Sequence, residues 1–584
     1  MTLADPHWPT VRVLQAAPPP ARRQQPVHLD GNAKRVLETG RTRLIVTGAL
    51  FAIAFAVVAL RLTAVALLQE RGEPLQARER SAPTLVVDRA DIVDRNGVVL
   101  ATSLPTASLY ANPRQVLDPQ EAAARLAEVL PELSQGELAS KLSADKSFVW
   151  LKRNLTPREQ YRVNRLGIPG LYFQNEERRV YPQGALTAHV VGFTDIDNRG
   201  LAGIEQSFDD VLRDSRRPLR LSIDVRLQHI LREEISRAMA DFTAIGGAGV
   251  ILDVRTGELL ALTSLPDFDP NQPGAASDDA RFNRASLGIY EMGSTFKIFN
   301  TALALDSGAV RMQDSFDATK PIRIGGFSIR DYHGKNRWLS VPEIFMYSSN
   351  IGSARMAEEV GGEAQKAFFA KLGMLRPVSV ELPEVGQPLY PSTWRPINTM
   401  TIAYGHGLAV SPLHLVSGVA AVVNGGILRP ATLIARDPDE IPDGERVISA
   451  DTSEKMRKLL RLVVEAGTGK SADVPGYLVG GKTGTADKQQ GKGYNRNSRL
   501  ASFVGVFPMN DPRYVVLVMV DEPKPNAKSF GYATGGWVAA PAVGRIIQRM
   551  APLMGMPPLP VDAPQTVDDL LIAVNATEEA RAFE

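Results

Sequence analysis

Residues 293–297 read GSTFK and open the stretch 294–305, whose apolar residues recur at helical spacing. Ser294 and Lys297 stand three residues apart, so a helix places both on one face, about one turn apart. A serine hydroxyl is a weak nucleophile without a base beside it, and a lysine made neutral by burial can be that base. Backbone N–H groups at a helix start can stabilise an oxyanion. Ser-x-x-Lys also recurs by chance, and alone it predicts only a capped helix with a solvated lysine.

A second motif is Ser348-Ser349-Asn350, which follows three apolar residues. A hydroxyl and an amide two residues apart on a loop can meet in one pocket, and this spacing selects Ser348 with Asn350. Serine and asparagine also cap helices, so this motif alone predicts little about chemistry.

A third motif is Lys482-Thr483-Gly484-Thr485, preceded by Val-Gly-Gly. In a strand, Lys482 and Gly484 face one side and the two threonines face the other. Glycine lets a substrate backbone approach, and a cation with hydroxyl groups suits a carboxylate ligand. Residues 476–483 also fit the phosphate-loop pattern, but the loop interior is Tyr-Leu-Val and no clear helix follows, so this alternative is rejected.

The three motifs stand in a fixed order, and together they resemble those of penicillin-binding proteins and serine β-lactamases. The resemblance extends over about residues 40 to 550. It includes segments similar to the non-catalytic domain of class B penicillin-binding proteins, for which we expect a role in domain packing. These segments are residues 89–97, residues 179–182, His189 and residues 203–205. Ala90 stands where glycine is usual, and Met292 where many relatives have proline.

The resemblance implies a serine D-Ala-D-Ala transpeptidase that cross-links peptidoglycan stem peptides and is inhibited by β-lactams. Asn350 and the residues after it are more similar to the division-specific, septal relatives than to the elongation type, which often has aspartate there. The implied catalytic residues are Ser294 as nucleophile, Lys297 as base, Ser348 as proton relay and Asn350 as a contact to the donor peptide. The implied residues for the donor's terminal carboxylate are Lys482, Thr483, Gly484 and Thr485. No metal or cofactor is expected.

Several alternatives stay open. One is an elongation-type transpeptidase, and another is a carboxypeptidase or β-lactamase-type hydrolase that uses water as acceptor. A third is a β-lactam sensor or a division scaffold with an inactive site, which the complete set of motif residues disfavours. The expected partners are donor and acceptor stem peptides, β-lactams, a membrane-spanning glycan polymerase and other division proteins. A formal net charge of +2 gives no indication of a nucleic-acid partner.

The fold class is predicted as α+β. Residues 249–264 and 501–520 each read as strand, turn, strand, and helical patterns lie between them. Asp224 precedes a further amphipathic helix. We therefore expect an antiparallel sheet flanked by helices, with a helical subdomain, as in the penicillin-binding and serine β-lactamase-like transpeptidase domain. An elongated α+β pedestal of the dimerisation type precedes it, after one transmembrane helix. The predicted regions are a disordered cytoplasmic tail at 1–43, a transmembrane helix at 44–68, the pedestal at 70–220, the transpeptidase domain at 221–556 and a flexible tail at 557–584.

Residues 44–68 are apolar except for Arg61 near one end, and a membrane helix needs about 20 such residues. Basic residues before this stretch predict a cytoplasmic N-terminus and a catalytic domain outside the inner membrane, in the periplasm. A cleaved signal peptide is disfavoured because the run exceeds the ~7–15 residues of a signal core. A buried core helix would have a polar face. The chain has no cysteine, which excludes disulfides, thiolate catalysis and Cys-ligated metal sites.

Overall fold

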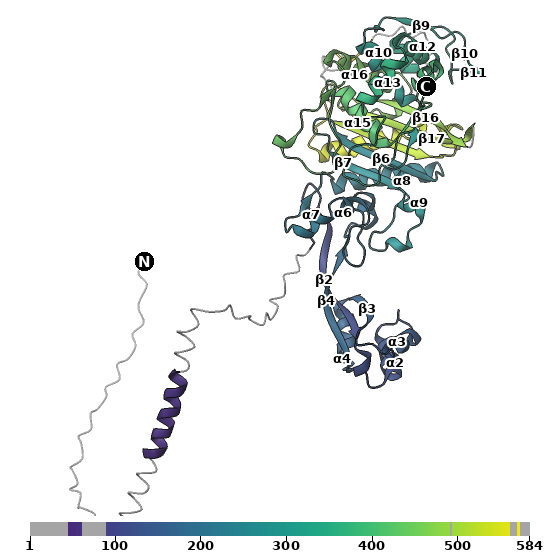
Figure 1. The fold of residues 1–584 in the computed structure, drawn as a ribbon. Helices are drawn as coiled ribbons and strands as arrows, with labels where there is room; N and C mark the ends of the chain where they lie inside the picture. The colour runs from purple at the N-terminus through teal and green to yellow at the C-terminus, as the bar shows by residue number, and fades with distance from the viewer. Residues whose placement is uncertain (1–44, 61–88, 491–492, 561–568, 573–584) are drawn as a thin grey trace, which may run out of the picture. The chain divides into compact units, whose positions relative to one another are not determined.

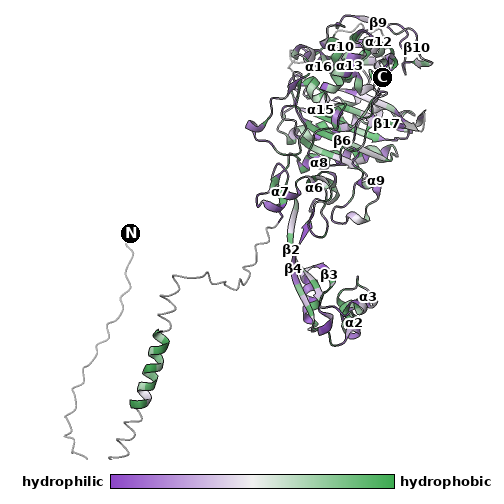
Figure 2. Ribbon diagram, viewed as in Figure 1, coloured by the Kyte–Doolittle hydropathy of each residue, from purple (hydrophilic) through white to green (hydrophobic). Residues whose placement is uncertain are grey.

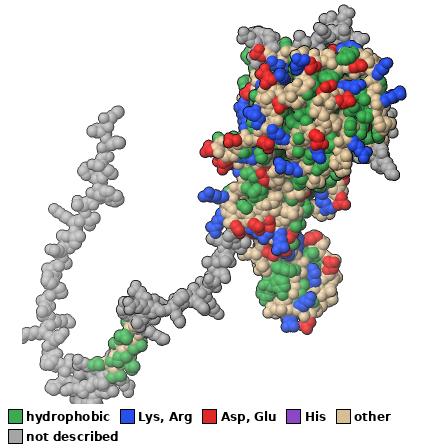
Figure 3. All heavy atoms as spheres, turned by 45° about the horizontal axis from the view of Figure 1, so that its top comes forward, with side chains coloured by type: hydrophobic (Ala, Val, Ile, Leu, Met, Phe, Trp, Pro, Cys, Tyr) green, Lys and Arg blue, Asp and Glu red, His purple; other side chains and the backbone are tan. Residues whose placement is uncertain are grey.

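The computed structural model of the protein describes residues 45–60, 89–490, 493–560 and 569–572 (Figure 1). The chain divides into two units, Met1–Thr84 and Leu85–Glu584, and each is described by itself. In the first unit, residues 45–60 are helical and almost entirely hydrophobic (Figure 2). Their large apolar side chains are exposed, as Figure 3 shows for this helix. Within these described ranges, no helix reaches the length and apolarity that crossing a membrane requires. The predicted tail 1–43 and the rest of the predicted span lie outside the described residues.

The second unit begins with the pedestal, in which the long strand β2 (Val99–Ala111) pairs antiparallel with β1, β3 and β4. The other pedestal strands are β1 (Ile92–Val93), β3 (Val149–Leu155), β4 (Leu171–Val180) and β5 (Leu219–Arg220). The pedestal helices are η1 (Pro113–Gln115), α2 (Pro119–Val129), α3 (Gln135–Leu142), α4 (Pro157–Arg165), η2 (Gly184–Thr187), α5 (Ala188–Val191), α6 (Gly203–Ser207) and α7 (Asp209–Asp214).

Helix α2 begins where the local sequence favours a helix start. Asp118 accepts hydrogen bonds from the N–H groups of Gln120 and Glu121, and Pro119 occupies the first helical position, where no N–H is needed. Leu126 of α2 is buried in one apolar cluster with Leu109 of β2 and Leu138 of α3. This cluster fixes the helices on the pedestal sheet.

The predicted pedestal motifs meet in a buried ionic network. The Nε atoms of Arg89 and Arg179 donate to separate oxygens of Glu205, at 2.6 and 2.7 Å. All three side chains are almost completely buried. The N–H of Gly203, in the same motif, donates to Glu384 in the transpeptidase domain at 3.1 Å. The segments that resemble the family's packing motifs are therefore in mutual contact.

The transpeptidase domain is built on a five-stranded antiparallel sheet in the order β16-β17-β18-β6-β7. Its strands and those around it are β6 (Gly246–Asp253), β7 (Leu259–Leu265), β8 (Tyr290–Glu291), β9 (Ser315–Asp317), β10 (Ile322–Ile324), β11 (Phe327–Ile329), β12 (Trp338–Ser340), β13 (Ala409–Val410), β14 (Ile427–Leu428), β15 (Glu445–Arg446), β16 (Gly480–Gln490), β17 (Gly493–Phe507) and β18 (Tyr514–Asp521). The α-helices are α8 (Val225–Asp241), α9 (Asp278–Arg281), α10 (Lys297–Asp306), α11 (Val341–Tyr347), α12 (Asn350–Val360), α13 (Gly362–Lys371), α14 (Pro396–Ile402), α15 (Pro412–Val423), α16 (Ala450–Glu465), α17 (Gly535–Val538) and α18 (Ala540–Leu553). The short 3-10 helices are η3 (Pro273–Ala275), η4 (Gly293–Phe296), η5 (Pro438–Glu440), η6 (Lys470–Ala472) and η7 (Ala527–Ser529).

Strand β18 is buried on both faces because helices cover both sides of the sheet. Val515 and Leu517 belong to one apolar cluster with residues of α10, α15 and α16. Val516 and Val518 belong to a second cluster with residues of α8 and α18. This alternation follows from the two-residue period of a strand, and each buried side chain of this size contributes about 1.5–3 kcal/mol. Figure 1 shows α8 on one side of the sheet and α15 on the other.

Both predicted hairpins are present, as β6–β7 and β17–β18, which confirms the expected antiparallel sheet. Helix α8 is capped by the carboxylate of Asp224, which accepts from the N–H of Arg226, as predicted. Above the sheet, α10, α12 and α14 enclose a smaller apolar cluster that includes Ile344 and Met400, which is the expected helical subdomain. Within the predicted C-terminal tail, Leu559 donates to the carbonyl of Gly476 at 2.8 Å, and Leu570 is buried against the main core.

Candidate active site

The GSTFK stretch forms a 3-10 turn, η4, that continues into α10 at Lys297. The expected helix start at Ser294 is therefore tighter than an α-helical turn. The reason lies at Gly293, which has a positive φ of 56°. A Cβ there would also come within 2.6 Å of the carbonyl oxygen of Thr485, so only glycine lets the turn rest against β16.

Lys297 lies at the centre of the site. Its Nζ is 2.7 Å from the hydroxyl of Ser294 and 2.7 Å from Oδ1 of Asn350. It is also 3.1 Å from the hydroxyl of Ser348 and 2.9 Å from the carbonyl oxygen of that residue. The side chain is fully buried. Burial lowers the pKa of Lys297 well below its ordinary value, and the charge of Lys482 lowers it further.

The second motif joins two helices. Ser348 ends α11 in the left-handed conformation, with a φ of 61°, and Asn350 begins α12. This turn aims the hydroxyl of Ser348 between Lys297 and Lys482, whose Nζ donates to it at 2.9 Å. Ser349 points away and caps α12 by accepting from the N–H of Gly352. Ser348, selected by spacing, is thus the serine that contacts both lysines.

The third motif lies on β16, with its faces divided as expected for a strand. Lys482 is fully buried and reaches Ser348, and burial lowers its pKa to about 7. On the other face, the hydroxyl groups of Thr483 and Thr468 are 2.8 Å apart, and Thr485 accepts from the N–H of Gly535 at 3.1 Å. The structure therefore brings all three motifs together.

Gly484 differs from the expectation that it leaves room for a substrate backbone. A Cβ at this position would meet the hydroxyl of Ser502 and would lie 2.8 Å from the carbonyl oxygen of Met292. The space beside Gly484 is therefore filled by β17 and by the residues that precede η4. Because Gly484 has no side chain, the turn at η4 can pack on the sheet there, and this space is not open to a ligand.

Asp331 was not found from sequence, yet it holds the second motif in place. It follows the hairpin β10–β11, and its Oδ1 accepts from the N–H groups of Asn350 and Ile351, at 2.6 and 2.9 Å. Its Oδ2 accepts from the hydroxyl of Ser349 at 2.7 Å. Thr468, beside Thr483, was also missed. Neither residue stands in a local pattern, so only the folded chain reveals its position.

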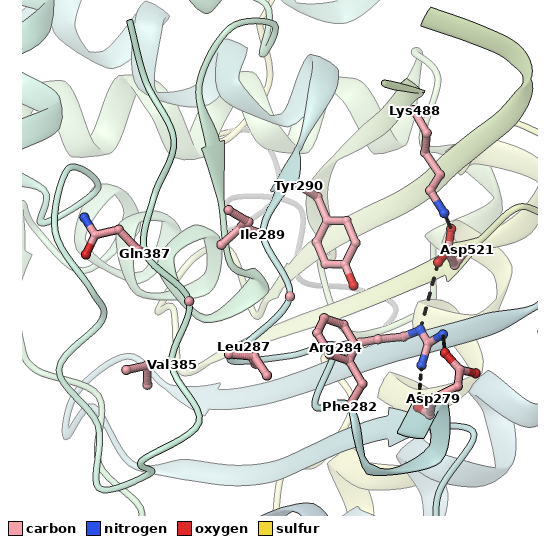
Figure 4. A pocket seen from close by; sticks show the side chains of 12 residues that line it. Asp279, Phe282, Arg284, Leu287, Ile289, Tyr290, Val385, Gln387, Lys488 and Asp521 are labelled. Carbon is pink, nitrogen blue, oxygen red and sulfur yellow. Dashed lines mark hydrogen bonds and ion pairs between the residues drawn. The ribbon is translucent and has the colours of Figure 1, made fainter. Parts of the chain in front are cut away.

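A cavity of about 670 Å³ lies beside β8 (Figure 4). Tyr290 lines it, and the buried Arg284 forms ion pairs there with Asp279 and Asp521. Lys488 also pairs with Asp521. None of the motif residues predicted from sequence lines this cavity, so it is separate from the Ser294 site.

The Ser294 site has the parts that acyl transfer requires. A serine hydroxyl lies beside an amine whose pKa favours the neutral form, and such an amine can accept the hydroxyl proton. A second hydroxyl links this amine to another buried lysine, which gives the proton a route away from Ser294. The threonine hydroxyls and the lysine near them suit a carboxylate.

Comparison with known proteins gives the same assignment. The family model of the penicillin binding protein transpeptidase domain matches residues 247–548, and that of the penicillin-binding protein dimerisation domain matches residues 84–217. The chain is 44% identical over 482 residues to the probable peptidoglycan D,D-transpeptidase FtsI of Caulobacter vibrioides, covering 80% of this chain and 82% of that protein. It is 30% identical over 596 residues to the peptidoglycan D,D-transpeptidase FtsI of Escherichia coli, covering 96% and 98%.

Among solved structures, penicillin-binding protein 3 of Mycobacterium tuberculosis in complex with aztreonam superposes with a TM-score of 0.64. It is 25% identical, and the match covers 84% of this chain and 99% of that one. The two family models cover the pedestal and the transpeptidase domain, and the second of these domains contains the three motifs. The protein therefore belongs to the class B penicillin-binding proteins, in the division-specific group of serine peptidoglycan D,D-transpeptidases.

Proposed function

We propose that Ser294 is the nucleophile of this transpeptidase and that Lys297 is its general base. The observation that carries this proposal is the 2.7 Å contact between the Nζ of Lys297 and the hydroxyl of Ser294, made by a lysine that is fully buried. Two buried ammonium groups that share the hydroxyl of Ser348 would repel each other. A neutral Lys297 beside a protonated Lys482 relieves this repulsion and leaves the base ready to act.

In the proposed acylation, Lys297 takes the proton of Ser294 while Oγ attacks the carbonyl carbon of the penultimate D-Ala. The backbone N–H groups of Ser294 and Thr485 stabilise the oxyanion. When the C–N bond breaks, Ser348 passes a proton to the nitrogen of the leaving D-Ala. An ester on Ser294 remains. The acceptor amine then attacks this ester, and the bond energy of the donor peptide is retained in the new cross-link.

The donor is proposed to bind along β16. Its terminal carboxylate docks at the hydroxyl groups of Thr483 and Thr485, with the charge of Lys482 behind the strand and Gly484 between them. Asn350 donates to the donor peptide through its side-chain amide. Penicillins carry a carboxylate at the matching position and monobactams such as aztreonam carry a sulfonate there, and the solved neighbour in complex with aztreonam supports acylation of Ser294 by β-lactams.

Labelling with a fluorescent penicillin tests these roles on the full-length protein in detergent. We expect a stable adduct on Ser294, no adduct in Ser294→Ala, and acylation at least about a thousandfold slower in Lys297→Ala, because the base is lost. Lys371→Ala, which removes an exposed lysine from the last turn of α13, is the matched control. Label retained by Ser294→Ala would show that another residue is the nucleophile.

We also propose that residues 44–68 anchor the protein in the inner membrane, with residues 1–43 in the cytoplasm. Support comes from the apolar sequence and from the helical, exposed residues 45–60. The pedestal, at 70–220, and the transpeptidase domain, at 221–556, would then lie in the periplasm, followed by the tail 557–584. Protease added to intact spheroplasts should remove epitopes after residue 70 and spare one before residue 43.

The proposed site of action is the division septum, where a membrane-spanning glycan polymerase would supply new strands. The names of the division-type relatives support this placement. A fluorescent fusion should gather at mid-cell in dividing cells. A dispersed side-wall pattern would instead favour an elongation role.

A further inference from the structure

Three aromatic rings and one carboxylate lie beside the nucleophile turn, outside the three motifs. We call Glu291, Tyr404, His406 and Tyr494 the Glu291 cluster. Oε1 of Glu291 accepts from the hydroxyl of Tyr494 at 3.2 Å. The ring of His406 is 5.2 Å from that of Tyr404 and 5.6 Å from that of Tyr494, between centroids. The cluster therefore joins residues from β8, the loop after α14 and β17.

The cluster is held against the nucleophile turn by the backbone. Glu291 stands two residues before Gly293, whose N–H donates to the carbonyl of Gly405 at 3.2 Å. Gly405 lies between Tyr404 and His406. The N–H of Gly407 donates to Oε1 of Glu291 at 2.7 Å, which ties the same loop to β8. The loop is thus attached on both sides of His406, and the cluster cannot move far from Ser294.

Glu291 faces away from the cavity drawn in Figure 4. Tyr290 lines that cavity, and successive side chains of a strand alternate between its two sides. Tyr494 belongs to the hairpin of β16 and β17, the hairpin that also carries Lys482 and Thr485. The cluster therefore lies between the nucleophile turn and the far end of the strand to which the donor is proposed to bind. A second substrate would approach the ester from such a position.

The rings of His406 and Tyr404 are uncharged near neutral pH. Burial lowers the pKa of His406 to about 4. Burial raises the pKa of Tyr404 well above its ordinary value, and the nearby Tyr494 and Glu291 contribute to this shift. A charged imidazole would repel an approaching cation, whereas neutral aromatic faces beside a carboxylate attract an ammonium group.

We propose that the Glu291 cluster binds the side-chain ammonium group of the acceptor stem peptide and delivers it to the ester on Ser294. This inference rests on the transpeptidase function proposed above and names the acceptor subsite within it. Tyr494, 47% exposed, is the ring that an incoming strand meets first. The carboxylate of Glu291 is the counter-charge, and Tyr404 and His406 complete the wall of the subsite.

The chemical step is an aminolysis. The bound ammonium releases one proton to solvent, and the resulting amine attacks the ester carbonyl carbon. A C–N bond forms, the bond from that carbon to Oγ of Ser294 breaks, and the second proton of the nitrogen passes through Lys297 to Oγ. The products are the amide cross-link, free Ser294 and one released proton, so no oxidant or reductant is needed.

The test is the partition of one acyl-enzyme between amine and water. The full-length protein in detergent is given a thioester analogue of a donor ending in D-Ala. The acceptor is a synthetic stem peptide with a free side-chain amine, and the same peptide with that amine acetylated is the blank. Mass spectrometry measures the ratio of amide product to hydrolysed donor. We expect Tyr494→Leu, His406→Ala and Glu291→Gln each to lower this ratio by about tenfold.

Two variants give matched comparisons. His406→Phe keeps a neutral ring and should restore most of the ratio lost in His406→Ala. Glu522→Gln removes a carboxylate that pairs with Lys488 near the tip of the same hairpin, and it should not change the ratio. An unchanged ratio in Tyr494→Leu and Glu291→Gln would overturn the inference. So would an equal fall of aminolysis and hydrolysis, because the cluster would then act on the donor.

Penicillin labelling of the same preparations separates this inference from the proposed function. If the parent protein forms the Ser294 adduct but the variants keep their partition ratio, only the acceptor subsite is wrong. If the parent forms no Ser294 adduct, the proposed nucleophile is wrong and the subsite loses its basis. Tyr494→Leu changes an exposed side chain, so it keeps the test usable if Glu291→Gln fails to fold.

Discussion

The carbonyl oxygen of Thr485 lies 2.6 Å from the point that a Cβ on Gly293 would occupy. The residue before the nucleophile and the last residue of the third motif are therefore in direct backbone contact. The distance from Ser294 to the proposed carboxylate site is set by this contact, which leaves no room for a side chain. It follows that small changes at Gly293 alter the geometry of the site without touching a catalytic group.

Gly293→Ala should slow penicillin acylation by at least about tenfold, because it adds both positive-φ strain and a clash, worth about 1–3 kcal/mol or more. Stopped-flow labelling measures the rate, and thermal unfolding measures the cost to stability. Gly308→Ala is the matched control, since Gly308 has a φ of 72° but open space where a Cβ would stand. Equal losses in the two variants would show that strain, rather than the contact with Thr485, explains the effect.

Asp331→Asn should slow acylation by about tenfold, because hydrogen bonds to a charged group contribute about 1.5–3 kcal/mol each and this carboxylate accepts three. The turn that carries Ser348 and Asn350 would lose its anchor, while Lys297 and Ser294 stay in place. The expected signature is a lower maximal acylation rate at saturating penicillin. Asp317→Asn, on the nearby strand β9, serves as control. A variant that only loses thermal stability and acylates at the parent rate would refute a positioning role.

The acylation rate should be bell-shaped in pH. Lys297 acts in its neutral form, so the rate falls as acid protonates it. Lys482 acts as a cation with a pKa of about 7, so binding of the donor carboxylate weakens as the pH rises above that value. Because the charge of Lys482 lowers the pKa of Lys297, Lys482→Gln should move the acid limb to higher pH. Second-order acylation rates from pH 5 to 9.5 measure both limbs, and an acid limb that stays in place would contradict this coupling.

Glu205→Gln should lower the free energy of unfolding by about 3–5 kcal/mol, because it leaves the buried cations of Arg89 and Arg179 with less compensating charge. Thermal and urea unfolding measure the loss. Glu128→Gln, an exposed residue of α2, is the control and should change stability by less than about 0.5 kcal/mol. At temperatures where the variant remains folded, its acylation rate should match that of the parent. A slow rate there would mean that the pedestal network acts on the active site itself.

Local pattern predicted the hairpins of the sheet, whereas the five charged or polar side chains at the centre of the site were identified only from the order of the three motifs and the family resemblance that this order carries. The strand period separated Lys482 from Thr483 and Thr485, and a spacing of two residues selected Ser348 over Ser349. Both predictions depend on the direction in which successive side chains point along the backbone. This direction is set by a few neighbouring residues and does not depend on the sequence farther away. The turn at Ser294 was predicted as an ordinary helix start, and the 3-10 geometry arises from a contact with β16 far along the chain.

Asp331, Thr468 and His406 were beyond the reach of such patterns. Each contacts a neighbour that is distant in sequence: Asp331 contacts Asn350, Thr468 contacts Thr483, and His406 packs against Tyr494. A single aspartate or histidine in a loop has no period and no fixed spacing to a motif. Its position depends on how the loops close over the sheet, which only the assembled core determines.

Ser294, Ser348 and Lys482 meet in one site, and each comes from a different region of the chain. Before those regions assemble, Lys297 is a solvated cation and Ser294 an ordinary alcohol, so an unfolded copy is chemically inert. Newly made chains therefore neither consume donor peptides nor react with antibiotic until this domain has folded. The amount of bound penicillin therefore measures folded enzyme rather than total protein. The decrease in penicillin binding on heating measures the unfolding of the transpeptidase domain alone.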